Sequence, residues 1–317
     1  MTMLKLDFLV PGSANDHFFS NIAFLKQSLA ALGGHYADAR LVAALGEWET
    51  PEIPPRWMPY LDGVEIIWSN PDKLPNPTYN AQHFDRFDNI RPDADVAVIC
   101  DADVCFMRPF DDVLAQIVRD DVIGGVMAHY HFPIDGVRGD PEEDWRRVAL
   151  GTIGKDISRP HPYLFGRSPE DPRVYAAADR PLAPFYINYG ILVGPPKKLQ
   201  QMHARERELI PLASQFVEPY FAAQVAVALS CADLELTTIA LPARFNFPNR
   251  PEADDLQPGE LDQVVMLHYM FEENFKRSRL FTHERFYNAF MQKDLSGVDR
   301  VFQDYVRSIC GDAYPFS

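Results

Sequence analysis

One short stretch, residues 96–103, constrains the fold more than any other part of the chain. The apolar residues Val96–Cys100 are followed at once by Asp101 and Asp103, with one residue between the two carboxylates. An apolar run this short, with charged residues on both sides, is typical of a buried strand. Side chains at positions i and i+2 of a strand point the same way. We therefore expect Asp101 and Asp103 to project together from the carboxyl end of a central strand, where open α/β sheets bind ligands.

Two neighbouring carboxylates favour a bound cation, because they repel one another when nothing lies between them. Oxygen ligands suit a hard divalent cation such as Mg²⁺ or Mn²⁺. The alternative is that Asp101 and Asp103 only end a strand and begin a turn, in which Asp is common. The residues that follow favour the metal site. The segment Arg108-Pro109 leads into a helix that begins near Asp111, and residues 122–128 have the pattern of a second apolar strand.

Composition limits the kinds of partner. The chain has 317 residues, of which 47% are hydrophobic and 24% charged, as expected for a soluble protein of one large or two modest domains. Its net charge of −15 argues against nucleic acid and anionic membranes, so a diphosphate ligand would need a local positive centre. No apolar run is long enough to cross a bilayer, and residues 1–10 make a poor signal peptide. Four cysteines do not make a disulfide framework, and we expect a cytoplasmic protein.

The order of the elements predicts an α/β fold. Strands are expected at residues 4–10, 39–45 and 64–68, and helices at residues 16–32 and 80–87. This alternation is typical of a mostly parallel sheet with helices on its faces. In the second half, a helix should begin after Asp140, and a long loop should cover residues 152–184. A buried helix is expected at residues 216–230 and a polar loop at 246–260. Further strands are expected at residues 186–194, 234–239 and 264–270. From residue 276 onward, two amphipathic segments predict a helical tail.

The run of strand, D-x-D, Arg-Pro-Phe loop, helix and strand resembles the metal-binding signature of nucleotide-sugar glycosyltransferases with the GT-A fold, especially the group of glycogenin and the bacterial galactosyltransferases. The resemblance implies one α/β domain, residues 1–275, with a mostly parallel central sheet flanked by helices, and a helical tail at 276–317. Residues 1–130 would form the nucleotide-sugar-binding half and residues 131–275 the acceptor-binding half. The implied activity moves a sugar from a nucleotide sugar, first of all a UDP-sugar, to a hydroxyl of a glycan or small-molecule acceptor, with Mn²⁺ or Mg²⁺ as cofactor.

The resemblance also implies a third metal ligand. His268 ends the apolar run of residues 264–267, well over a hundred residues after the D-x-D, as the C-terminal metal-binding His of these enzymes does. With Asp101 and Asp103 it would form a mixed oxygen and nitrogen set, which makes Mn²⁺ somewhat more favourable than Mg²⁺. The alternative is a satisfied core histidine. Relatives of glycogenin carry a Gly and then a phosphate-binding Lys soon after this His, whereas here the Gly is missing and Lys276 comes two positions late.

Further candidates follow from the same resemblance. Arg86, in Phe-Asp-Arg-Phe, matches the Arg-bearing helix that helps to hold the nucleotide sugar; the alternative is a structural salt bridge to a neighbouring Asp. Pro11 and Gly12, after the first strand, are candidate donor contacts. Asn188, in Ile-Asn-Tyr-Gly, resembles the family's Asn that binds a sugar hydroxyl, although an ordinary strand with a Gly bulge explains the pattern too.

The segment that contains Gln224, together with the Leu-Pro and Phe-Asn pairs that follow it, is similar to the region of these glycosyltransferases that holds the reacting sugar. Ala223 stands where many members have an acid, so Glu218 is the nearest candidate for a general base. A retaining route would need only Gln224 and assistance to the leaving group, whereas an inverting route would need a base; the sequence leaves both open. A metal-dependent nucleotidyltransferase and a non-catalytic sugar-binding protein of the same fold are the alternatives. The first usually has a Gly- and Lys-rich phosphate loop near its N-terminus, which this chain lacks.

Overall fold

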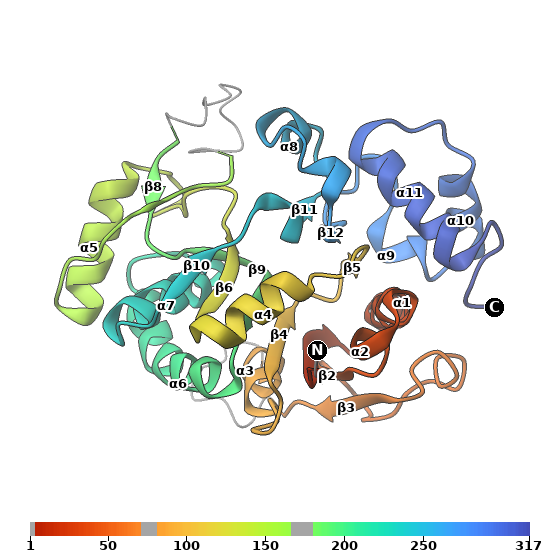
Figure 1. The fold of residues 1–317 in the computed structure, drawn as a ribbon, viewed down its shortest axis with the longest axis horizontal. Coiled ribbons are helices and arrows are strands. Elements are labelled where there is room, and N and C mark those ends of the chain that lie inside the picture. Colours follow the sequence, from red (N-terminus) through yellow and green to blue (C-terminus); the bar gives the residue numbers. More distant parts are fainter. Residues whose placement is uncertain (1–3, 71–80, 166–179) are drawn as a thin grey trace.

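The computed structural model describes residues 4–70, 81–165 and 180–317. Its centre is a seven-stranded sheet (Figure 1). The strands lie in the order β10 (Thr238–Ala240), β6 (Ile123–Met127), β9 (Ile187–Gly194), β4 (Val96–Cys100), β1 (Leu6–Ser13), β2 (Arg40–Gly46) and β3 (Val64–Trp68). β9 runs antiparallel to its neighbours β4 and β6, and the other pairings of this sheet are parallel. The predicted fold class, a mostly parallel sheet flanked by helices, is confirmed.

The strand that ends at the D-x-D lies in the middle of this sheet. Val96, Val98 and Cys100 belong to one hydrophobic cluster with residues of α1 (Asp16–Leu32) and α4 (Asp111–Asp120). Ala97 and Ile99 belong to a second cluster with residues of α3 (Ala81–Asp88), α6 (Pro196–Ala213) and α7 (Pro219–Asp233). Every residue of β4 is fully buried. A strand covered on both faces has no polar alternation, which is why β4 is an unbroken apolar run in the sequence.

Local signals set the ends of the helices that were predicted. The side chain of Asn15 accepts a hydrogen bond from the backbone N–H of Phe18 at the start of α1, and Gly33, with φ of 69°, ends that helix. Asp140 accepts hydrogen bonds from the N–H groups of Glu142 and Glu143 at the start of α5 (Pro141–Ile153). These side chains satisfy N–H groups that have no partner within a helix. The predicted helix starts at Asn15 or Asp16 and at Asp140 are confirmed, and the remaining short helix α2 (Gly34–Ala37) follows α1 directly.

A second, small sheet brings distant parts of the chain to the end of β4. It consists of β11 (Phe247–Pro248), β12 (Met266–His268) and β5 (Val104–Phe106). β12 runs antiparallel to β5 and places His268 opposite Val104. The predicted strand over residues 264–270 therefore exists, although it is shorter and pairs outside the main sheet. The predicted loop after Asp103 contains β5, because the three buried residues Val104–Phe106 need a strand partner for their backbone groups.

Several other elements differ from the sequence prediction. The helix α6 has no counterpart among the elements predicted from the sequence; it is rich in Lys, Arg, Gln and Glu. The helix predicted at 216–230 begins at Pro219 and runs on to Asp233, so the following strand is confined to Thr238–Ala240. The polar loop at 246–260 contains β11 and the helix α8 (Pro251–Leu256). Residues 166–179 of the predicted long loop, and residue 80 of a predicted helix, lie outside the described residues. The remaining short elements are β7 (His161–Pro162), β8 (Leu182–Ala183), η3 (Ala243–Phe245) and η4 (Leu261–Gln263).

The C-terminal tail is helical, as predicted, and packs against the first helix of the chain. It contains α9 (Arg277–Leu280), α10 (Glu284–Met291) and α11 (Gly297–Cys310), which gather beside α1 in Figure 1. Phe281 stacks on Phe24 of α1 with ring centroids 4.4 Å apart. Phe302 stacks on Tyr269, just after β12, at 4.8 Å. The tail thus shares the hydrophobic cluster of α1, which fixes the position of α9 relative to the end of β4.

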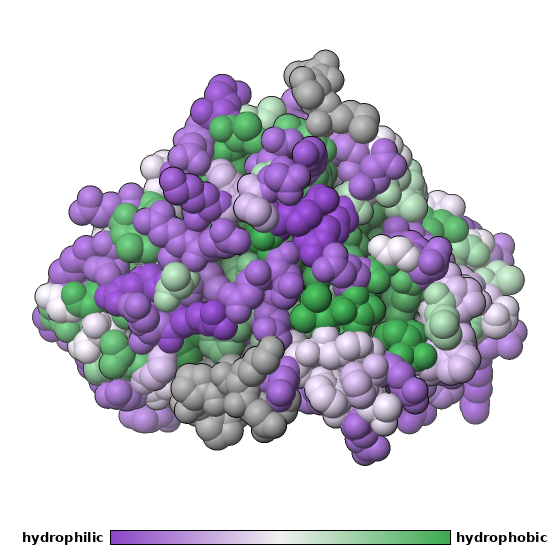
Figure 2. All heavy atoms as spheres, turned by 90° about the horizontal axis from the view of Figure 1, so that it is seen from below, coloured by the Kyte–Doolittle hydropathy of each residue, from purple (hydrophilic) through white to green (hydrophobic). Residues whose placement is uncertain are grey.

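The surface is of ordinary character. Hydrophilic residues cover the larger part of the face seen in Figure 2, with hydrophobic residues interspersed among them. Across the three described ranges, no helix has the length and apolar character needed to cross a bilayer. Cys100, Cys105, Cys231 and Cys310 are free thiols.

Candidate functional site

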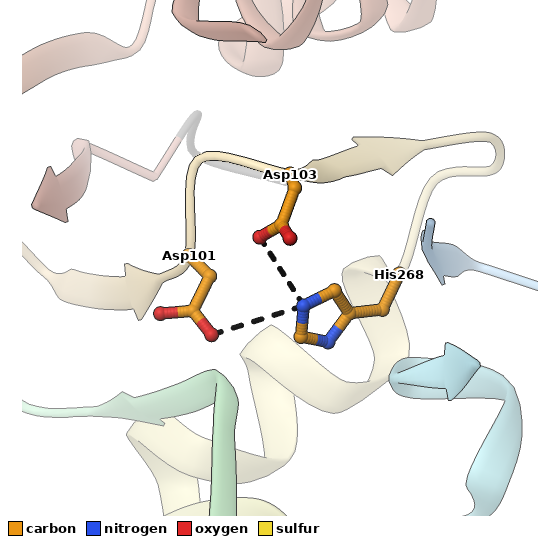
Figure 3. Close-up of side chains that lie close together, drawn as sticks. All are labelled: Asp101, Asp103 and His268. Atoms are coloured by element: carbon orange, nitrogen blue, oxygen red, sulfur yellow. Dashed lines mark hydrogen bonds and ion pairs between the residues drawn. The ribbon is translucent and has the colours of Figure 1, made fainter. Parts of the chain in front are cut away.

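Asp101, Asp103 and His268 point toward one another at the carboxyl end of β4 (Figure 3). Nε2 of His268 lies 3.2 Å from Oδ1 of Asp103 and 3.8 Å from Oδ2 of Asp101. One ligand atom from each of the three side chains falls within 4.8 Å of the others. The pairing of β12 with β5 brings His268 to this end of β4. Next to that pairing, the backbone N–H of Tyr269 donates to the carbonyl oxygen of Asp103 at 3.1 Å. The structure therefore places side by side the three residues that were predicted from the sequence as metal ligands.

A chain of side chains orients His268 from behind. Nδ1 of His268 lies 3.0 Å from Oδ1 of Asn246, so the imidazole turns its Nε2 edge toward the carboxylates. Nδ2 of Asn246 donates to Oδ1 of Asn188 at 2.9 Å, and the same oxygen accepts from the backbone N–H of Gly190 at 2.8 Å. A β-carbon at position 190 would overlap the Asn246 amide. Metal-binding histidines are usually held by such an outer hydrogen bond, so the arrangement fits a cation ligand.

The electrostatics of the three residues also fit a cation site. Burial opposes ionisation of Asp103, but His268 and Arg277 together hold the pKa of its carboxyl well below the ordinary range. Burial raises the pKa of Asp101, with His268 acting in the opposite direction. Burial alone would lower the pKa of His268, yet the neighbouring Asp103 and Asp101 carboxylates raise it. Two carboxylates and one imidazole, turned toward one point, are a donor set that suits Mn²⁺ or Mg²⁺.

The three residues lie in a cleft of about 500 Å³, within the range of about 300 to 1,000 Å³ typical of small-molecule sites. Residues from β1, α1, α3, the end of β4, β9, α7 and the tail line it. The cleft brings together most of the site residues predicted from the sequence, namely Pro11, Gly12, Arg86, Asp101, Asp103, Gln224 and His268.

Arg86 is a buried cation beside the first carboxylate. Its side chain is 2% exposed, and its Nη1 lies 3.9 Å from Oδ1 of Asp101. Its guanidinium lies over the ring of Tyr189, 4.8 Å from the centroid, and its Nη2 lies 3.0 Å from Nδ1 of His83. Nε and Nη1 make no hydrogen bond to any residue of the described ranges. The ion pair foreseen as the structural alternative therefore exists, and the same side chain still offers N–H groups at the cleft.

Glu206 of α6 holds the partners of Arg86 in place, and the sequence analysis missed it. Its carboxylate is fully buried and lies 2.8 Å from Nε2 of His83, 2.6 Å from the hydroxyl of Tyr189 and 2.7 Å from Nδ1 of His203. Burial opposes its ionisation, but His83 and His203 hold its pKa well below the ordinary range. His83 thus lies between Arg86 and the negatively charged Glu206 and contacts both. The spacing of His203 and Glu206, three residues apart, is the one sequence signal for this contact.

Three predicted residues lie outside the lining of the cleft. Asn188 stands behind it and contacts Asn246, as described above. Glu218 is exposed at the N-terminus of α7 and makes no capping hydrogen bond there. Lys276 is exposed and pairs with Glu272 at 3.5 Å. Its neighbour Arg277 lines the cleft instead, and Nη1 of Arg277 contacts Oδ2 of Asp103.

Other lining residues offer polar groups that the sequence analysis did not single out. Asn21 of α1 is fully buried, and neither polar atom of its amide has a hydrogen-bond partner in the part of the chain that the structure describes. His17, one turn earlier, has an unpartnered Nδ1, and Tyr220 at the start of α7 is 77% exposed. Buried polar groups without partners are uncommon in native proteins. Along this cleft, these groups are available to hydrogen-bond a polar ligand or water.

Comparison with solved structures agrees with this fold. No protein-family model and no curated protein matches the sequence. Among solved structures, an active-site mutant of LgtC aligns with a TM-score of 0.50 and 13% identity, over 96% of each chain. This likeness shows the fold: the chain has the GT-A fold of nucleotide-sugar glycosyltransferases, as the resemblance predicted.

Two further structures are similar at lower scores. The galactosyltransferase LgtC in complex with donor and acceptor sugar analogues aligns with a TM-score of 0.48 and 14% identity, over 94% of this chain and 99% of that chain. Mouse xyloside xylosyltransferase 1 aligns with a TM-score of 0.47 and 12% identity, over 83% of this chain and 98% of that chain.

Proposed function

We propose that this protein is a metal-dependent glycosyltransferase that moves a sugar from a nucleotide sugar, with UDP-sugars as the first candidates, to a hydroxyl group of a glycan or small molecule. The observation that supports it best is the meeting of Asp101, Asp103 and His268 in a cleft at the carboxyl end of the sheet. A group of this kind can hold a divalent cation, with Mn²⁺ preferred to Mg²⁺ because one ligand is nitrogen. When bound, such a cation supplies Lewis-acid stabilisation of the charge on a leaving diphosphate.

The residues around the metal group have distinct proposed roles. Arg86, whose free N–H groups stand beside Asp101, contacts the donor's phosphates or sugar. The backbone at Pro11 and Gly12, at the end of β1, contacts the nucleotide. Gln224 lines the cleft on α7 and hydrogen-bonds the transferred sugar. Asn188 acts through Asn246 and His268 rather than on the sugar directly.

We propose a retaining reaction rather than an inverting one. An inverting transferase needs a general base near the acceptor hydroxyl. Among the described lining residues, the carboxylates are Asp101 and Asp103, both assigned to the cation, while Glu218 lies outside. We therefore propose the retaining route, with Gln224 near the sugar and assistance from the leaving group; an inverting route would have to use a histidine of the lining, such as His17, as its base. We also propose that residues 1–130 bind the nucleotide sugar and residues 131–275 bind the acceptor. The tail at 276–317 contributes Arg277 to the cleft.

A panel of nucleotide sugars tests the proposal. Thermal unfolding of the protein with each donor, with and without Mn²⁺, should show stabilisation by one donor class that requires the cation, because a ligand that binds only the folded state raises its unfolding temperature. Incubation of that donor with candidate acceptors should then give a glycosylated product and the nucleoside diphosphate. Release of pyrophosphate from a nucleoside triphosphate and a sugar phosphate would identify a nucleotidyltransferase instead. Binding without any product would leave a sugar-binding protein.

A further inference from the structure

Arg277 occupies one oxygen of the carboxylate that a cation would need. Its Nη1 contacts Oδ2 of Asp103, while Oδ1 of the same carboxylate lies 3.2 Å from Nε2 of His268. In the protein without ligand, Oδ2 of Asp103 is therefore engaged by the Arg277 guanidinium, while Oδ1 faces the imidazole of His268. Asp101 differs, because its nearest cationic groups, Arg86 and His268, are 3.9 Å and 3.8 Å away. Arg277 thus competes with a divalent cation at Asp103 in particular.

The remainder of the Arg277 guanidinium is only partly satisfied. Among the described residues, its buried Nε has no hydrogen-bond partner, and the contact to Asp103 is its one ion pair. Its side chain is about one third exposed and lines the cleft. Asp103 alone does not use all five N–H donors of a guanidinium. The unused N–H groups are available to a ligand in the cleft.

The positive charge of Arg277 would also help to bind a diphosphate in the cleft. Among its described lining residues, the only Arg or Lys side chains are Arg86 and Arg277. They lie on the two sides of the carboxylate pair, Arg86 beside Asp101 and Arg277 beside Asp103. A diphosphate bound at the pair, in a protein of net charge −15, would gain little attraction from elsewhere. A guanidinium fork also matches the oxygens of a phosphate better than an ammonium group does.

We propose that Arg277 has two successive partners. In the free protein it is the counter-ion of Asp103, and in the donor complex it leaves Asp103 to the divalent cation and binds the diphosphate. The C-terminal tail thereby contributes a donor-binding residue, at the position next to the exposed Lys276. This inference rests on the proposed function, since it takes a nucleoside diphosphate as the ligand of the cleft.

The exchange predicts opposite effects of one substitution on two ligands. Arg277→Ala removes the competitor at Asp103, so Mn²⁺ alone should bind roughly two- to tenfold more tightly than to the wild type. The same substitution removes a charged hydrogen-bond donor to phosphate, so UDP at saturating Mn²⁺ should bind roughly 10- to 100-fold more weakly. A residue with only a structural role would weaken both ligands together or neither.

Calorimetric titrations of the full chain with Mn²⁺ alone, and with UDP at saturating Mn²⁺, test this exchange. Arg279→Ala is the matched control, because it removes the same charge from the same helix, where Arg279 lies over the ring of Phe286 instead. It should leave both affinities within about twofold of the wild type. Arg277→Lys keeps the charge and loses the fork, so its Mn²⁺ affinity should stay near the wild-type value while UDP binding weakens. If Arg277→Ala folds poorly, Arg277→Lys still tests the contact with the diphosphate, through its weaker binding of UDP.

Equal or weaker binding of Mn²⁺ by Arg277→Ala would overturn the inference, and so would unchanged binding of UDP. These outcomes differ from a failure of the proposed function. A wild-type protein that binds neither Mn²⁺ nor UDP contradicts both. A protein that shows the opposite shifts but transfers no sugar contradicts the function alone.

Discussion

The ring of His268 is hydrogen-bonded through Nδ1 to the side-chain oxygen of Asn246, 3.0 Å away, and this contact turns its other nitrogen toward Asp101 and Asp103. The two residues come from different elements: His268 ends β12, and Asn246 follows the short helix η3. Asn246 is itself fully buried and bonded to Asn188. The orientation of one proposed metal ligand is therefore set by two residues that are not ligands.

Asn246→Ala tests this relationship. Loss of the outer hydrogen bond frees the imidazole to rotate, and we expect Mn²⁺ affinity to fall roughly 10- to 100-fold, as for other outer-sphere residues of metal sites. Calorimetric titration with Mn²⁺ in the presence of UDP measures this. Asn288→Ala, on α10 and away from the cleft, is the control and should behave as the wild type. Unchanged Mn²⁺ affinity in Asn246→Ala would show that His268 needs no such support.

Gly190→Ala probes the same chain from its far end. The added β-carbon would overlap the Asn246 amide, and overpacking of this kind costs about 1 to 3 kcal/mol of stability. Urea unfolding should show the loss. In the double variant Gly190→Ala with Asn246→Ala the overlap is gone, so the two losses should not add. Additive losses would mean that the alanine at position 190 is accommodated in some other way.

Glu206→Ala should destabilise the whole protein. The carboxylate is fully buried and has three partners, and removing one member of such a network costs about 3 to 5 kcal/mol. Because His83 then loses its anchor, Arg86 should also lose its orientation and UDP binding should weaken. Glu208→Ala, in the same helix but exposed and paired with Arg205, is the control, with an expected change within about 0.5 kcal/mol. Urea unfolding and UDP titration give both readings.

Gln224→Ala separates the sugar from the phosphates. Its proposed partner is the transferred sugar, so the variant should turn over donor roughly 10-fold or more slowly while its affinity for UDP stays within about twofold of the wild type. Steady-state rates and UDP titration measure the two quantities. A parallel loss of UDP affinity would place Gln224 on the nucleotide instead.

Much of this fold could be predicted from the sequence where one physical signal acts locally. The apolar run of β4, the cap at Asn15 and the cap at Asp140 each depend on neighbours in the chain, and each prediction was confirmed. The meeting of Asp101, Asp103 and His268 could be predicted only because a resemblance linked the two carboxylates to a histidine far along the chain. Spacing alone does not connect them, since the small sheet of β5 and β12 that joins them has strands of three residues each.

The parts that could not be predicted depend on tertiary contacts. Glu206 is polar and lies in a polar helix, so its sequence gives no sign that β9 and α3 will bury it. Lys276 was chosen by its distance from His268, yet the packing of the tail on α1 directs the next residue, Arg277, into the cleft. Glu218 was chosen as the acid nearest to Gln224 in sequence, and the start of α7 at Pro219 leaves it on the surface.

Hydrolysis of the donor in the absence of acceptor tests the central claim most directly. The donor selected by the thermal-unfolding panel is incubated with the wild type, with Asp103→Asn and with the exposed control Asp262→Asn, each with Mn²⁺ or with a chelator, and the products are followed by NMR. We expect the wild type and Asp262→Asn to release free sugar and nucleoside diphosphate slowly, only with Mn²⁺, and Asp103→Asn to release neither. Equal release by Asp103→Asn, release that persists in chelator, or pyrophosphate as the only product would contradict the account.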